Sequence, residues 1–282
     1  MNVFSVKEEL KKPIRLTQQS YNAKTRREEP YVVVVKDEVK SYALCPGCKN
    51  PTILVNRHVE QTDSNTLYAK HTGYSVPNLA NHNQEAYESC PHHNPLRFDI
   101  KTRRGNSEAN NEIRTALINH THLVIRFLEG ATGITYCDSV IESMIRHFGG
   151  NKGHEYKAIN MYNLPFGFGY MTESQDLFGC KVNEAIAQHI NTQSNQFKVN
   201  NFGYVGRING TTGNEIRLYF NNHKFSSTPD GSDTVEMFIE EVGAAASTAN
   251  RLFSKKIAFD SAYFYNSYLR QELLRLLALE YL

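Results

Sequence analysis

The 282-residue sequence contains no tryptophan and only five cysteines. It also lacks any run of the roughly eighteen apolar residues that a membrane-spanning helix requires. Its first residues include acidic and basic side chains rather than an apolar signal core. These absences predict a cytoplasmic, intracellular protein with no membrane partner. The P-loop, the nucleophile elbow and the zincin helix are missing as well, which argues against phosphotransferase, hydrolase and metalloprotease chemistry.

The formal net charge of +2 is too small to indicate nucleic-acid binding by itself. Basic residues are nevertheless clustered in two places. The first thirty residues carry Lys7, Lys11, Lys12, Arg15, Lys24, Arg26 and Arg27, and a second group consists of Arg97, Lys101, Arg103 and Arg104. Both clusters are candidates for phosphate contacts, and solvated loops explain the same residues without a function.

The segment Tyr42–Asn94 holds three of the five cysteines and five of the eleven histidines. Cys45 and Cys48 form a Cys-x2-Cys turn, in which Gly47 lets the backbone bend around a metal ion. Cys90 and His93 repeat the two-residue spacing. Two such pairs closing one tetrahedral site are typical of structural zinc, so we expect Zn2+ bound by Cys45, Cys48, Cys90 and His93.

Three other histidines compete for the fourth ligand position: His92, His82 and His71. A thiol pair that merely packs, or a disulfide, is the alternative to a metal site. A closed site with four protein ligands leaves no position for water or substrate, whereas an open position would favour chemistry.

The order Cys45, Cys48, His71, Asn83, Cys90 and His93 resembles the zinc-knuckle form of the His-Asn-His (HNH) endonucleases. The resemblance implies that His71 activates a water, that Asn83 holds the loop and that a second metal sits on the scissile phosphate. Those nucleases usually carry an acidic residue directly before the first catalytic histidine, where this sequence has Lys70. The similarity is confined to residues 45–93.

The remaining cysteines, Cys137 and Cys180, are far from each other in the sequence and lie in apolar surroundings. We expect both to be buried free thiols.

The predicted fold class is α+β. We expect a basic irregular arm (residues 1–30), a zinc-knuckle module with short antiparallel strands (31–105), and a mixed domain of amphipathic helices and an antiparallel sheet that ends in a Leu/Tyr-rich helix (106–282). Several elements are expected within these regions: a buried strand at 31–36 beside 52–55, helices at 108–128 and 135–148, a hairpin of 202–208 with 215–220, a helix from 233 to about 253, and the final helix at 261–282.

These features favour a zinc-stabilised, nucleic-acid-associated binding protein that works as a non-catalytic subunit of a larger complex. A metal-dependent nuclease centred on His71 and Asn83 is the first alternative. A zinc-stapled scaffold for protein partners, which would bind through the C-terminal helix, is the second.

Overall fold

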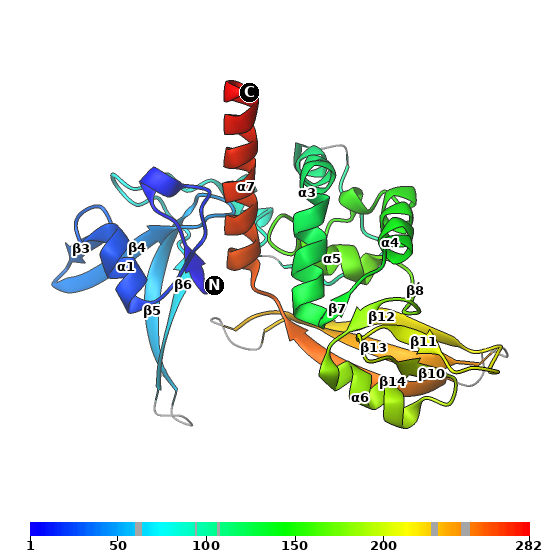
Figure 1. Cartoon of the computed structure of the whole chain (residues 1–282). Coiled ribbons are helices and arrows are strands. Elements are labelled where there is room, and N and C mark those ends of the chain that lie inside the picture. Colours follow the sequence, from blue (N-terminus) through cyan, green and yellow to red (C-terminus); the bar gives the residue numbers. More distant parts are fainter. Residues whose placement is uncertain (60–63, 94, 106–107, 227–230, 244–248) are drawn as a thin grey trace. The chain divides into compact units, whose positions relative to one another are not determined.

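The computed structural model describes residues 1–59, 64–93, 95–105, 108–226, 231–243 and 249–282. The chain divides into two compact units (Figure 1). Unit 1 comprises residues 1–96, 225–232 and 260–282, and unit 2 comprises residues 97–224 and 233–259. Helices and antiparallel strands occur in both units, which confirms the predicted α+β class.

Unit 1 contains the following elements, in chain order: β1 (Val3–Phe4), the 3₁₀ turn η1 (Lys7–Glu9), β2 (Ile14–Arg15), α1 (Gln18–Thr25), β3 (Val32–Val35), β4 (Glu38–Leu44), β5 (Pro51–Val59), β6 (Ser64–His71), α2 (Gln84–Glu88) and α7 (Ser261–Tyr281).

Unit 2 contains these elements: α3 (Glu108–Thr132), β7 (Ile134–Thr135), α4 (Asp138–Gly150), η2 (Gly153–Glu155), α5 (Leu164–Met171), β8 (Gln175–Asp176), β9 (Lys181–Val182), α6 (Glu184–Gln193), β10 (Phe197–Val199), β11 (Val205–Arg207), β12 (Glu215–Lys224), β13 (Thr234–Val242) and β14 (Ala249–Ala258).

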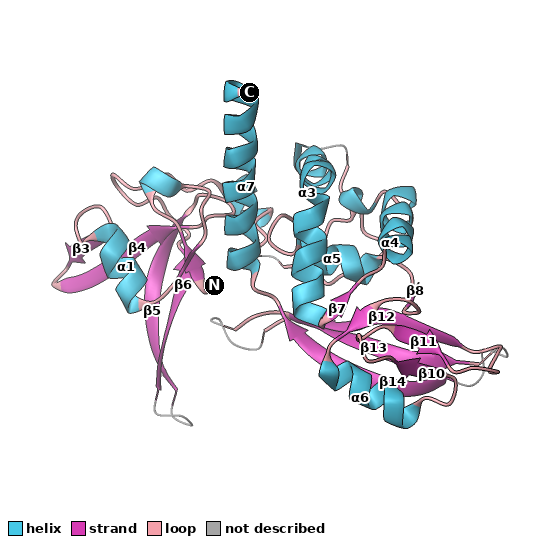
Figure 2. Ribbon diagram, in the orientation of Figure 1, coloured by secondary structure: helices cyan, strands magenta, loops and turns pink. Residues whose placement is uncertain are grey.

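The main sheet of unit 1 is antiparallel in the order β3-β4-β5-β6 (Figure 2). The strand predicted at 31–36 is present as β3, but the expected partner is wrong, because β4 lies between β3 and β5. Lys36 and Asp37 both adopt positive φ, 52° and 64°, which is the conformation of a two-residue hairpin turn. This tight turn returns the chain into β4 and leaves β3 at the sheet edge. Val34 is therefore 69% exposed, and the strand is not buried as expected.

Residues 1–30 are not an irregular arm. Phe4, Val6 and Tyr21 are buried in the core of unit 1 together with residues of β4 and β6. The Tyr21 hydroxyl lies 2.9 Å from the carbonyl oxygens of both Tyr31 and Tyr42 and so ties α1 to the sheet. The high polar content of residues 1–30 predicts an arm, but Phe4, Val6, Leu16 and Tyr21 are buried in this core, whereas Leu10 is exposed.

The C-terminal helix α7 belongs to unit 1 and not to the predicted mixed domain of residues 106–282. Phe264 and Tyr265 near its start are buried, and the side-chain amide of Asn266 donates to the carbonyl of Pro13 at 2.7 Å. The second half of the helix exposes Leu273, Leu274, Leu276 and Leu279. No helix in the described part of the chain is both long and apolar enough to cross a membrane.

The main sheet of unit 2 is antiparallel in the order β14-β13-β12-β8. The helix expected from 233 to 253 is wrong, because β13 and β14 occupy this part of the chain. Val235, Met237 and Ile239 are all buried, and their spacing of two residues is the period of a strand. Asp233 and Glu236 have the spacing of a capping box and predict a helix, but the alternation of buried residues outweighs this local pattern.

The expected pairing of 202–208 with 215–220 is also wrong. β11 pairs with β10, whereas β12 pairs with β13 and β8. The helix predicted at 108–128 is confirmed as α3, although its backbone leaves helical geometry at His120 (φ −132°, ψ 30°). The helix predicted at 135–148 is confirmed as α4, three residues further along at its start.

Candidate metal centre

The first two donors of the candidate site lie in the turn between β4 and β5. The backbone N–H of Lys49 donates to the carbonyl of Cys45 at 2.7 Å, and Lys49 has a positive φ of 62°. This turn points the Cys45 and Cys48 thiols to the same side. A Cβ atom on Gly47 would lie 3.0 Å from a ring carbon of His92 and 3.4 Å from the Cys90 sulfur, so glycine lets the second loop approach closely.

His71 is the last residue of β6 and is placed by strand register. In the β5·β6 ladder His71 pairs with Thr52, which is four residues after Cys48. Strand pairing in the sheet therefore places the His71 imidazole beside the turn that carries Cys45 and Cys48.

Cys90 reaches the site through the short helix α2. The Asn83 side chain caps this helix, because its Oδ1 accepts the Ala86 N–H at 2.9 Å. The buried Asn50 side chain clamps the same residue from the other side: its Oδ1 accepts the Asn83 N–H at 2.6 Å, and its Nδ2 donates to the Asn83 carbonyl at 3.0 Å. Asn50 thus joins the end of the knuckle to the helix that carries Cys90, a role that the sequence analysis missed.

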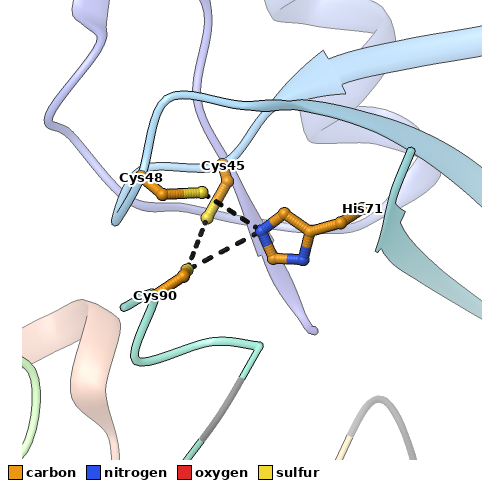
Figure 3. Close-up of side chains that lie close together, drawn as sticks. All are labelled: Cys45, Cys48, His71 and Cys90. Carbon is orange, nitrogen blue, oxygen red and sulfur yellow. Dashed lines mark hydrogen bonds between the residues drawn. The ribbon is translucent and has the colours of Figure 1, made fainter. Parts of the chain in front are cut away.

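Four potential ligand atoms converge in unit 1, from Cys45, Cys48, His71 and Cys90 (Figure 3). All four atoms lie within 4.8 Å of one another. The Cys45 and Cys90 sulfurs are 3.6 Å apart, and His71 Nε2 lies 3.3 Å from the Cys48 sulfur and 3.7 Å from the Cys90 sulfur. It is the only such group of three or more His, Cys, Asp or Glu side chains among the described residues.

These spacings match what zinc requires. With Zn–S bonds of about 2.3 Å and a Zn–N bond of about 2.0–2.1 Å, a tetrahedral ion separates two sulfurs by about 3.8 Å and a sulfur from a nitrogen by about 3.5 Å. The distances of 3.6 Å between the Cys45 and Cys90 sulfurs, and of 3.3 Å and 3.7 Å from His71 Nε2 to the Cys48 and Cys90 sulfurs, lie close to these values. Three thiolates and one imidazole are also a donor set that soft-ligand chemistry assigns to zinc. The group can therefore hold a metal ion, and its donors fit zinc.

The three thiols of the group differ in acidity, because their pKa values are shifted in different directions. Burial raises the pKa of Cys45 well above its ordinary value, and its hydrogen bonds with Cys48 and Cys90 act in the same direction. Hydrogen bonds with Cys45 and Cys90 lower the pKa of Cys48 despite partial burial. The pKa of Cys90 rises to about 12: the hydrogen bond with Cys45 lowers it, but the bond with Cys48 and burial outweigh that effect. Zinc binds thiolates, so it would displace the protons of Cys45 and Cys90.

The other candidate histidines lie outside this group of four. His93, the expected fourth ligand, stacks on the ring of Tyr87 with a centroid distance of 3.7 Å. Its own ring centroid is 5.7 Å from that of His71. His82 Nε2 lies 3.0 Å from the side-chain oxygen of Gln84. His71, one of the three alternatives, therefore supplies the fourth potential ligand of the group, and the register of the β5·β6 ladder rather than residue spacing places it there.

The structure gives the candidate phosphate contacts different environments. Arg103 donates to the carbonyls of Asn151 at 2.8 Å and Lys152 at 3.2 Å, and its guanidinium lies over the Tyr156 ring. Arg104 is half-buried and donates to the carbonyls of two residues, Tyr156 and Ile159. Both guanidinium groups thus donate hydrogen bonds to backbone carbonyls of unit 2.

The other two residues of this group, Arg97 and Lys101, are exposed on unit 2. The four basic residues and the metal group belong to different units.

Comparisons of the chain with protein-family models, with curated proteins and with solved structures find no match.

Proposed function

We propose that this chain is a zinc-stabilised, nucleic-acid-associated binding protein, and that its zinc is a structural element rather than a catalyst. The observation that carries the proposal is the donor group itself. Four protein atoms within 4.8 Å of one another can occupy all four positions of a tetrahedral ion, which would leave none for water or substrate. Catalytic zinc sites keep such a position open.

A structural ion has a clear task in this part of unit 1. It would join three segments that are far apart in the sequence: the knuckle around Cys45, the end of β6 at His71 and the loop after α2 at Cys90. The knuckle and the α2 loop contribute few buried apolar side chains beyond the two cysteines. Zinc would supply the stabilisation that such loops cannot obtain from a core.

Zinc content and chelation test this part of the proposal. Purified protein should hold one equivalent of zinc, and removal of the ion with a chelator should lower the melting temperature of the chain. Cys90→Ser should lose the metal, whereas Cys137→Ser, a matched change outside the group of four, should keep it. Full zinc retention in Cys90→Ser would exclude this site.

The nucleic-acid part of the proposal draws on exposed basic side chains. Lys11, Arg15, Arg26 and Arg27 are exposed on unit 1. Lys12 and Lys24, by contrast, both form ion pairs with Glu9, at 2.8 Å and 2.7 Å. Non-specific contacts of this kind bind phosphate and do not read sequence.

A salt titration of binding to single-stranded DNA, double-stranded DNA and RNA tests this part. Affinity should fall linearly with salt on a logarithmic scale, and replacing Arg26 and Arg27 together by glutamine should reduce the slope by about two. Arg146→Gln, which removes an exposed arginine already paired with Glu142, is the matched control. Absence of binding to all three nucleic acids at low salt would remove this part of the proposal.

The contacts of His71 and Asn83 support the nuclease alternative less well than they support a structural zinc site. His71 directs Nε2 at two thiols, and a metal-bound nitrogen cannot act as a general base. Asn83 caps α2. Incubation with plasmid and Mg2+ or Mn2+ should therefore give no cleavage, and cleavage that is lost in His71→Ala would reverse this conclusion.

The exposed leucines of α7 favour a second candidate, a zinc-stapled scaffold for protein partners. Leu273, Leu274, Leu276 and Leu279 are each at least 50% exposed. Single exposed leucines are common, but several on one helix are typical of a contact surface. Replacing Leu273 and Leu276 by glutamate should abolish a protein complex if this helix forms it, and should leave zinc content unchanged. A complex that survives this change would exclude α7 as its contact.

A further inference from the structure

The two cysteines outside the metal group lie side by side in unit 2. The Cys180 thiol donates to the Cys137 sulfur with a distance of 3.7 Å between the two sulfurs. The strand pair β7·β9 brings them together, since Thr135 pairs with Lys181 and the two cysteines follow and precede these residues. Among the described residues, no third His, Cys, Asp or Glu donor is grouped with this pair.

The two thiols differ in their access to solvent. Cys180 is fully buried, with 0% of its surface exposed, whereas Cys137 is half-buried. Gly179 lies against Cys137, and a Cβ atom at this position would be 4.0 Å from its sulfur. Gly179 has a positive φ of 79°, so the turn itself favours glycine. Cys137 is thus the solvent-accessible member of the pair.

Cys137 also occupies the N-cap position of α4, a helix of thirteen residues. The positive end of a helix stabilises a thiolate. The Ser139 hydroxyl lies 3.3 Å from the Cys137 sulfur and can donate to it. This position and these neighbours provide a nucleophilic thiolate at Cys137 and a protonated thiol beside it.

The acidities of the two groups agree with this division of roles. Partial burial raises the pKa of Cys137, but hydrogen bonds from Ser139, Val140 and Cys180 outweigh it, so the pKa lies below the ordinary value. Burial raises the pKa of Cys180 to about 12. Such an unequal pair, with one accessible thiolate and one buried thiol, is typical of reactive cysteines rather than of two inert core residues.

We propose that Cys137 and Cys180 form a redox-active dithiol that hydroperoxides oxidise to an intramolecular disulfide. The Cys137 thiolate attacks one oxygen of hydrogen peroxide, the O–O bond breaks, and the products are a sulfenic acid on Cys137 and hydroxide. The Cys180 sulfur then attacks the sulfenic sulfur, the S–O bond breaks, and the oxygen leaves as water with the Cys180 proton. Two thiols and one peroxide thus become one disulfide and two waters, and a dithiol reductant restores the pair by exchange.

The second step, formation of the disulfide, joins two sulfurs that already lie side by side. A disulfide requires about 2.05 Å between sulfurs, so the two sulfurs must approach each other by about 1.6 Å from their present separation of 3.7 Å. The product would link the start of α4 to the segment before β9. The disulfide is therefore a modification of unit 2 alone, and it does not depend on the zinc proposal for unit 1.

Peptide mapping of the zinc-loaded full-length chain tests the proposal. After a low dose of hydrogen peroxide and blocking of free thiols, trypsin should release the peptides 127–146 and 158–181, which contain one cysteine each, joined by a disulfide. In the reduced protein a thiol reagent should modify Cys137 at least about tenfold faster than Cys180. The rate should reach half its maximum at a pH below the ordinary thiol value of about 8.5.

Two variants distinguish a redox-active thiol pair from two cysteines that only pack in the core. Cys180→Ser should stop at the sulfenic acid, which dimedone traps on Cys137, and Cys137→Ser should leave Cys180 reduced at the same peroxide dose. Equal peroxide resistance of both thiols, or a disulfide that uses a zinc-site cysteine instead, would overturn the proposal. If a variant fails to fold, as judged by circular dichroism, disulfide mapping of the unmodified chain decides the question alone.

Discussion

Replacing His71 by alanine should weaken zinc binding strongly, whereas replacing His93 by alanine should not. The two residues are the sharpest pair for this test, because the spacing of the sequence favours His93 and the arrangement of side chains favours His71. His71 Nε2 lies 3.3 Å from the Cys48 sulfur, within the group of four donors. His93 is exposed and stacks on Tyr87.

The expected size of the effect follows from the number of donors. Structural zinc sites contribute about 10–16 kcal/mol, so one ligand in four accounts for about 2.5–4 kcal/mol if all contribute equally. Loss of His71 should therefore weaken binding about 100-fold to 1000-fold. Loss of His93 removes one exposed ring stack, worth about 0.5–1.5 kcal/mol, and this cost falls on the stability of the fold rather than on the metal.

Competition with a chromogenic zinc chelator measures these affinities, and Co2+ substitution reports the ligand set through its absorption bands. His71→Cys serves as the matched rescue, since a fourth thiolate also makes a tetrahedral zinc site and should restore binding. The reasoning fails if His71→Ala binds zinc as tightly as the unmodified chain, or if His93→Ala shows the larger loss.

Three further predictions concern other parts of the chain. Asn83→Ala should remove the cap of α2 and lower the free energy of unfolding by about 1 kcal/mol, with a smaller loss in zinc affinity than His71→Ala; an unchanged melting temperature would contradict this role. Gly153→Ala should destabilise unit 2 by about 1–3 kcal/mol in denaturant titrations, because its Cβ would lie 2.5 Å from the buried Phe148 ring, and a neutral effect would contradict that packing. Burial lowers the pKa of His223, so below about pH 6.5 the unfolded chain binds a proton that the folded chain does not, and stability should fall as the pH drops. His223→Asn keeps an acceptor for the Phe98 N–H and should lose less stability between about pH 7.5 and about pH 5.5; an equal loss would assign the effect to other groups.

Several features were predictable from residue spacing because they depend on neighbours in the sequence. The Cys-x2-Cys turn identified Cys45 and Cys48 through local geometry, and Cys90 followed from its own short-range pattern. Helices α3 and α4 repeat apolar residues at helical spacing, and this signal does not require knowledge of the partner. The alternation of β13 is equally local, but Asp233 and Glu236 have the spacing of a capping box, which predicts a helix where the strand forms.

The sequence by itself therefore determined the α+β class, three of the four side chains in the candidate zinc group and the positions of the longest helices. Only the tertiary structure decided that His71 completes that group, that residues 1–30 fill a core, and that Cys137 meets Cys180. The physical reason is the same in each case. Strand register and hydrophobic packing join segments that are distant along the chain, and the free energy that selects one pairing over another arises from contacts that no local pattern contains.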